Sequence, residues 1–152
     1  MPPKGSQQPL NDERPRAKGE GMNIPGNCRY SKDHFWVKPE GNEAVIGLSD
    51  YLQEELGDAI FVDLPDVDDD VEVAGTFGII ESTRSVSDMT APVTGTVIQV
   101  NTDLEDGPEL INEDPYGDGW LFRVQLDDPQ QIDSLMTPEE YEEYIADLVL
   151  ED

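Results

Sequence analysis

From Tyr30 onward, the chain consists largely of short apolar runs, rich in β-branched and aromatic residues, separated by turn residues. Runs of this kind are typical of β-strands. The run from Trp120 to Leu126 alternates most clearly, because the apolar side chains at 120, 122, 124 and 126 would share one face. We predict further strands over Phe35–Lys38, Ala44–Leu48, Ala59–Leu64, Val71–Val73, Phe77–Glu81 and Thr96–Val100. Many short strands joined by turns, such as one at 39–42, favour a small sandwich or barrel.

Residues 49–56 follow a helical pattern instead. Ser49 is a suitable N-cap, because its hydroxyl can accept a hydrogen bond from a free backbone N–H in the first turn. Gly57 is a suitable C-terminal stop, since glycine adopts the left-handed conformation that ends many helices. We therefore predict a short helix between the second and third predicted strands.

The C-terminal region also changes to a helical period. Thr137 and Glu140 form a capping box, with Pro138 at the first helical position. The apolar residues that follow have the spacing of a single stripe, which we expect to pack on the sheet: Tyr141, Tyr144, Ile145 and Leu148. A shorter helix capped by Asp128 is expected just before it, burying Ile132, Leu135 and Met136.

Length and composition narrow the class of protein. The 152 residues suffice for one domain, which we place at residues 22–152. Residues 1–21 are rich in Pro, Gly and polar groups and are predicted to be disordered. No apolar run is long enough to span a membrane, and no signal-peptide pattern opens the chain, so we expect a cytoplasmic protein. A single cysteine, Cys28, excludes an internal disulfide, and its exposure is left open.

The formal net charge of -26 excludes further classes. Nucleic acids and anionic membranes bind clustered Lys and Arg, and this chain has 35 Asp and Glu against 9 Lys and Arg. A lone histidine cannot build a His-rich metal site, and the acidic run at 66–70 lacks the glycine and distal glutamate of a calcium loop. The acidic excess indicates either a salt-rich cytoplasm or simply a well-solvated surface, and both remain open.

The segment from Gly78 to Val100 resembles the hairpin that presents the modified lysine in lipoyl- and biotinyl-type domains. In it, a strand ends at Glu81, a tight turn follows, and a second strand leads to an Ala-Pro-Val-Thr-Gly sequence. Over almost the whole chain from Met22, the sequence is similar to the glycine cleavage system H-protein family. The matching segments are YSKDHFWV (30–37), GLSDYLQEELGDAIFVDLPDV (47–67), ESTRSVSD (81–88), APVTGTVIQVN (91–101) and NEDPYGDGWLFRVQ (112–125).

This resemblance implies a mainly β, lipoyl-type barrel-sandwich hybrid with short helices and a C-terminal helix. It also implies a carrier rather than an enzyme. In the family, lipoate on the tip lysine receives an aminomethyl group from the P-protein and delivers it to the T-protein and tetrahydrofolate. The L-protein, a flavin dehydrogenase, then reoxidises the dithiol. A lipoate ligase or transferase is a further expected partner.

The chain departs from the family at the tip of the hairpin. By register within ESTRSVSD, Arg84 occupies the position of the lipoyl-lysine. A guanidinium stays protonated at neutral pH and offers no nucleophilic lone pair, so Arg84 cannot be lipoylated by the usual chemistry. A shifted register cannot restore the site, because residues 39–152 contain no lysine. We therefore expect no cofactor on this chain, and lipoate only if residue 84 is natively lysine.

A second departure is Phe35, which stands where the family usually has a glutamate that holds the loaded arm. Asp88 matches the other arm-facing acid of the family. His34 could contact the arm or be structural, and Glu81 and Ser82 are expected to shape the hairpin. The sequence offers no nucleophile–base pair, phosphate-binding glycine loop or metal cluster, which argues against an enzyme.

Three explanations of Arg84 stay open at this point. In the first, arginine replaces a native lysine, and the parent protein is an ordinary carrier. In the second, arginine is natural, and the chain is a binding or regulatory module that docks glycine-cleavage or lipoylation enzymes. In the third, the scaffold serves an unrelated interaction.

Overall fold

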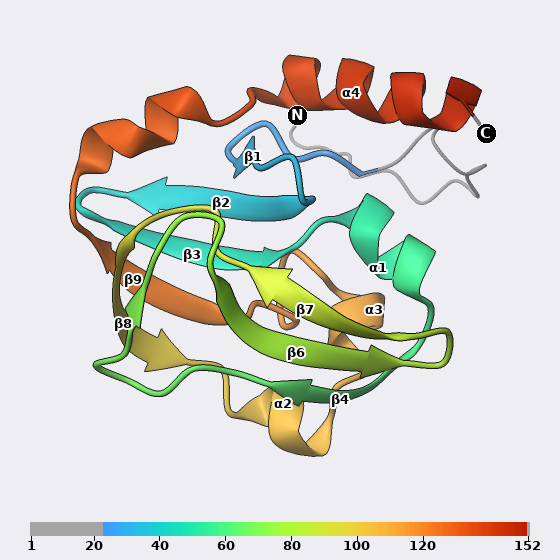
Figure 1. Cartoon of the computed structure of the whole chain (residues 1–152), viewed down its shortest axis with the longest axis horizontal. Coiled ribbons are helices and arrows are strands. Elements are labelled where there is room, and N and C mark those ends of the chain that lie inside the picture. Colours follow the sequence, from blue (N-terminus) through green and yellow to red (C-terminus); the bar gives the residue numbers. More distant parts are fainter. Residues whose placement is uncertain (1–22, 152) are drawn as a thin grey trace, which may run out of the picture.

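The computed structural model describes residues 23–151 and shows a mainly β fold with short helices and a C-terminal helix (Figure 1). The prediction of disorder for residues 1–21 lies outside the described residues. The strands are β1 (Arg29–Tyr30), β2 (Phe35–Glu40), β3 (Glu43–Leu48), β4 (Ala59–Asp63), β5 (Asp70–Val71), β6 (Thr76–Ser82), β7 (Val86–Thr90), β8 (Gly95–Val100) and β9 (Phe122–Leu126). The helices are α1 (Asp50–Leu56), α2 (Asp103–Asp106), α3 (Leu110–Glu113), the 3-10 helix η1 (Pro129–Ser134) and α4 (Pro138–Glu151).

The strands form two antiparallel sheets. One has the order β1-β2-β3-β9-β8-β5, and the other has the order β4-β6-β7. The main core includes residues of both sheets, such as Val37, Ile46, Ile80 and Val124. Side chains alternate along a strand, so each sheet has one face in the main core and a second, outward face. Other segments either cover this outward face or leave it exposed.

The outer face of β2 and β3 is covered by a second apolar cluster that includes α4. Trp36 and Val45 point away from the main core and join Tyr30, Tyr141 and Ile145 in this cluster. The predicted stripe on the C-terminal helix is therefore confirmed as packing. In Figure 1, α4 runs along the side of the molecule where β1 and β2 lie.

A glycine makes room for the largest side chain of this cluster. Gly47 lies opposite Trp36 in the β2–β3 pair, and a Cβ at residue 47 would come within 2.5 Å of the indole. The indole N–H donates to the Pro115 carbonyl at 2.9 Å, so the buried polar group is satisfied.

The predicted helix caps are confirmed. The Ser49 hydroxyl accepts from the Leu52 N–H at 3.2 Å. The Thr137 hydroxyl accepts from the Glu140 N–H at 3.2 Å, while the Glu140 carboxylate accepts from the Thr137 N–H at 2.9 Å. The Asp128 carboxylate caps η1, which is a 3-10 helix.

Several predicted boundaries were wrong, because contacts with other segments decide them. The predicted turn at 39–42 is shorter, since β2 runs to Glu40 and only residues 41 and 42 turn. Trp120 does not share a face with the other apolar residues of β9: it packs in the second cluster, while Leu121 is buried in the main core. The strand predicted at 71–73 ends at Val71, and Val73 is exposed. The short helices α2 and α3 were not predicted.

Cys28 is buried, and burial raises the pKa of its thiol to about 11. The thiol is therefore neither accessible nor ionised at neutral pH.

Candidate functional site

The site begins with the predicted turn between β6 and β7, which is shorter than expected: β6 continues to Ser82, one residue past the predicted strand end at Glu81, and β7 begins at Val86. Ser82 is buried and holds this turn from within. Its Oγ accepts hydrogen bonds from the backbone N–H groups of Arg84, at 3.3 Å, and Ser85, at 3.2 Å. The backbone N–H of Ser82 donates to the Ser85 carbonyl at 2.8 Å. The tip residue is therefore presented on a tightly bonded turn.

Arg84 stands at this tip, but its side chain lies against its own domain. One guanidinium nitrogen donates to the carbonyls of Glu54, at 3.2 Å, and Glu55, at 3.0 Å. These carbonyls belong to the last turn of α1, where the helix leaves carbonyls without internal partners and where a cation is favourable. Arg84 thus acts as a side-chain cap for the C-terminus of α1.

Gly57 allows this close approach. It ends α1 with a φ of 84°, in the left-handed region that favours glycine. A Cβ at residue 57 would lie 2.8 Å from the Thr83 Oγ1 and 3.3 Å from the Arg84 Nε. The stop residue predicted from the sequence therefore also makes room for the hairpin tip.

A small cleft of about 220 Å³ lies beside the hairpin, between β7, α1 and the start of β2. Its lining includes Phe35 and Asp88, so the structure brings together the two positions that the family resemblance places beside the arm. Its other lining residues are Asp33, Leu52, Leu56, Ile80, Ser87, Met89 and Thr90. Glu81, Ser82, Arg84 and His34 do not line it.

Asp33 is a cleft residue that the sequence analysis missed. Its carboxylate accepts a hydrogen bond of 2.7 Å from the Thr90 hydroxyl, which ties the turn before β2 to the end of β7. In the sequence, the one feature that could have indicated its place in the cleft is that it stands two positions before Phe35. The lining of the cleft therefore includes two acidic residues, Asp33 and Asp88.

Phe35 belongs to the core as much as to the cleft. It is 3% exposed and packs edge-on against Phe77 with ring centroids 5.7 Å apart. Phe77 in turn packs edge-on against Phe122 at 4.9 Å. An ionised glutamate at residue 35 would lose its hydration against this aromatic row, which explains why an apolar side chain suits this chain.

His34 faces the second cluster rather than the cleft. Its Nδ1 is 2.9 Å from the Tyr141 hydroxyl, which is also 2.7 Å from the Ser49 Oγ. The imidazole packs on the Tyr51 ring, with centroids 4.7 Å apart. Burial lowers the pKa of His34 below its ordinary value, in spite of the nearby acids. These contacts are those of a structural histidine.

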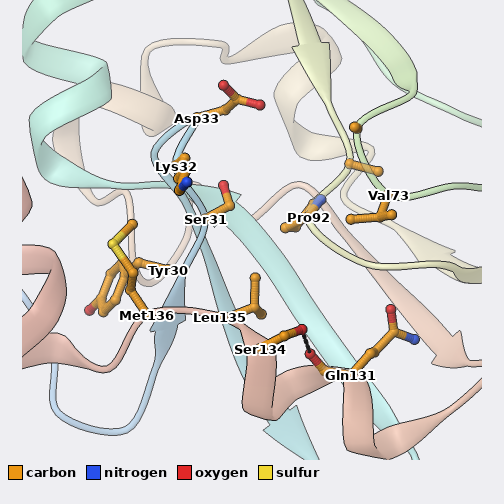
Figure 2. Close-up of a pocket in the computed structure, with 12 residues that line it drawn as sticks. Tyr30, Ser31, Lys32, Asp33, Val73, Pro92, Gln131, Ser134, Leu135 and Met136 are labelled. Carbon is orange, nitrogen blue, oxygen red and sulfur yellow. Dashed lines mark hydrogen bonds between the residues drawn. The ribbon is translucent and has the colours of Figure 1, made fainter.

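A larger hollow lies elsewhere (Figure 2). It has a volume of about 530 Å³ and is bounded by the Ser31–Asp33 turn, by Val73 and Pro92, and by Leu135 and Met136. None of the site residues predicted from the sequence lines it. Among residues 23–151, His, Cys, Asp and Glu side chains form no group of three that could hold a metal ion.

A two-sheet sandwich with a short-turned hairpin beside a small cleft has the fold of the lipoyl-type domains. Comparisons with known proteins identify the family. The family model described as glycine cleavage H-protein matches residues 28–148, and the chain belongs to this family. The family is the lipoate-carrying component of the glycine cleavage system.

Individual relatives agree. The chain is 48% identical over 120 residues to a glycine cleavage system H protein of Magnetococcus marinus, covering 79% of this chain and 86% of the relative. It is 48% identical over 126 residues to the H protein of Staphylococcus saprophyticus subsp. saprophyticus, covering 83% of this chain and 100% of the relative. A crystal structure of the Mycobacterium marinum H protein matches with a TM-score of 0.71 and 39% identity, covering 78% of this chain and 95% of that one. The predicted barrel-sandwich fold is thereby confirmed.

Proposed function

We propose that this H-protein-family chain carries no lipoate at residue 84 and acts as a docking scaffold for the other glycine cleavage components. The expected partners are the P-, T- and L-proteins and a lipoate ligase or transferase. The observation that carries the proposal is Arg84 at the hairpin tip, where a guanidinium replaces the amine that lipoylation needs. No catalytic role is proposed for the chain, and the cytoplasmic address expected from the sequence remains a prediction.

The contacts of Arg84 support a natural role for the arginine. One guanidinium nitrogen of Arg84 donates to two carbonyls at the end of α1, where a cation is favourable. Phe35 points the same way, since its buried ring removes a carboxylate from the arm's resting place. Asp33 and Asp88 still line the cleft, so a cationic load would meet acidic groups if a lysine stood at the tip.

Substitution of Arg84 by lysine tests this proposal. The purified chain and the Arg84→Lys variant are each incubated with a lipoate ligase, ATP and lipoate, and their intact masses are measured. We expect the unsubstituted chain to keep its mass and Arg84→Lys to become heavier by one lipoyl group. Ser85→Lys is the matched control, because it places a lysine one residue away on the same turn and should stay unmodified.

The intact mass of the protein from its own source completes the test. A mass equal to the unmodified chain supports a natural non-carrier. A mass heavier by one lipoyl group, with lysine found at residue 84, would restore the ordinary carrier and overturn the proposal.

A further inference from the structure

Exposed apolar side chains gather on the outer face of the three-stranded sheet. Among the described residues, seven large apolar side chains are exposed, and four of them lie on β4, β6 and β7. These are Ile60 and Phe61, each 53% exposed, Ile79 at 36% and Val86 at 68%. We name this set the outer patch. The core does not account for these four residues, because the inward-facing side chains of the same strands are others, such as Val62 and Ile80.

The strand register places the residues of the outer patch in two neighbouring rows, where they alternate with acidic residues. Phe61 lies opposite Glu81, and Glu81 lies opposite Val86, so these three side chains form one row across β4, β6 and β7. Two residues further along, Ile79 lies between Asp63 and Asp88 in the next row on the same face. A bulge between Ala59 and Phe61 leaves Ile60 exposed as well. Figure 1 shows these three strands side by side.

The acids on this face are not neutralised by the domain's own cations. Within residues 23–151, the ion pairs join Lys38 and Arg123 to Glu40 and Glu43. The side chains of Asp63, Glu81 and Asp88 take no part in them. Arg84 is the one basic residue between 39 and 122, and its guanidinium is directed to the carbonyls of α1. On the outer patch, apolar side chains therefore alternate with acidic side chains that form no ion pair within residues 23–151.

These features select one kind of occupant. A second copy of the chain would bring another net charge of -26 against the same face, and nucleic acid would also be repelled. A protein surface that presents apolar side chains interspersed with Lys and Arg matches both the side chains and the charges. We propose that the outer patch is the docking surface for such a partner. The proposal rests on the docking role proposed above and gives it a location.

The patch also borders the tip of the hairpin. Glu81 and Val86 are the paired residues immediately flanking the turn that carries Arg84. A partner bound across Phe61 and Val86 would therefore have residue 84 at the edge of its footprint.

Binding to each of the P-, T- and L-proteins, measured by isothermal titration calorimetry with purified components, tests the location. We expect Val86→Ser and Phe61→Ser each to weaken binding of at least one of the three by about tenfold or more, the effect of losing a central apolar contact. Val73→Ser is the matched control, because Val73 is 59% exposed but lies outside the three-stranded sheet. We expect it to change affinity less than about twofold.

Charge is tested separately with the variant Asp63→Asn/Glu81→Gln/Asp88→Asn. Binding of the unsubstituted chain should weaken as salt is raised, and this variant should bind more weakly with a shallower salt dependence. Undiminished binding by Val86→Ser and Phe61→Ser, or equal loss with Val73→Ser, would overturn the outer patch alone. Failure of the unsubstituted chain to bind any of the three proteins would overturn the docking role and this proposal together. Circular dichroism confirms that each variant is folded.

Discussion

The side chain of His34 connects the turn before β2 to both α1 and α4. Its ring is surrounded by Tyr51, Tyr141 and Tyr144, with centroid distances of 4.7, 5.7 and 5.6 Å. A neutral imidazole can accept the Tyr141 proton at Nδ1, and the Tyr141 oxygen can then accept the Ser49 proton. Burial lowers the pKa of His34 because a charged imidazolium would lose hydration among these rings.

This burial predicts a contribution to the pH dependence of stability. The unfolded chain binds a proton at His34 more readily than the native chain, so stability falls as pH drops through about 6.5, the ordinary pKa of histidine. His34→Asn should remove this contribution, and asparagine tolerates the φ of 76° found at residue 34. Urea unfolding at pH 5.5 and 7.5 gives the free energy of unfolding of the unsubstituted chain and of His34→Asn. The contribution of the carboxylates is common to both proteins and cancels in the comparison. Equal pH dependence in the two chains would contradict the prediction.

At the scale of elements, α1 links the second cluster to the hairpin. Its first residues are held by Ser49, whose hydroxyl is within hydrogen-bonding distance of the Leu52 N–H and the Tyr141 hydroxyl. Its last carbonyls accept hydrogen bonds from Arg84. Asn112 of α3 supports the same end, because its amide donates to the Gly57 carbonyl at 2.9 Å. The hairpin tip therefore rests on a helix that is fixed at both ends.

We predict that Ser49→Ala destabilises the protein more than Thr137→Ala does. Loss of an N-cap costs about 1 kcal/mol in either helix. Ser49 is fully buried, however, and its removal also takes a partner from the buried Tyr141 hydroxyl, which adds about 1 kcal/mol or more. Urea denaturation of the two variants gives the comparison. A loss for Ser49→Ala no larger than that for Thr137→Ala would show that the Tyr141 contact contributes little.

For the molecule as a whole, charge is the dominant feature. The chain has 35 acidic and 9 basic residues, so the acidic groups repel one another over most of the surface. Within residues 23–151, Lys38 and Arg123 relieve this repulsion around Glu40 and Glu43. No helix in that part of the chain is long and apolar enough to cross a membrane.

Added salt is therefore expected to stabilise this protein. Screening shortens the range of repulsion from roughly 10 Å at 0.1 M to roughly 3 Å at 1 M, so the thermal midpoint should rise between these potassium chloride concentrations. A sugar at equal osmolality serves as the control, since it does not screen charge. A midpoint that does not rise with salt would favour a merely well-solvated acidic surface.

Much of the local structure, and one decisive fact about the site, could be predicted from the sequence. The caps at Ser49, Asp128 and Thr137 and the β6–β7 turn depend on residues a few positions apart, so short-range patterns suffice for them. The presence of Arg84 and the lack of any lysine after residue 38 are matters of sequence alone. The proposed absence of lipoylation follows from that chemistry without reference to the fold.

Only the tertiary structure decided which distant residues meet. Leu121 packs in the main core and Trp120 in the second cluster. Both residues precede β9, so the in-and-out alternation of strand side chains does not apply to them. Asp33 reaches the cleft through Thr90, and Arg84 reaches the carbonyls of α1, across separations that no local pattern spans. Phe61 and Val86 likewise share a row only through the register of three strands. The physical reason is that strand pairing is non-local, whereas periodicity and capping are local.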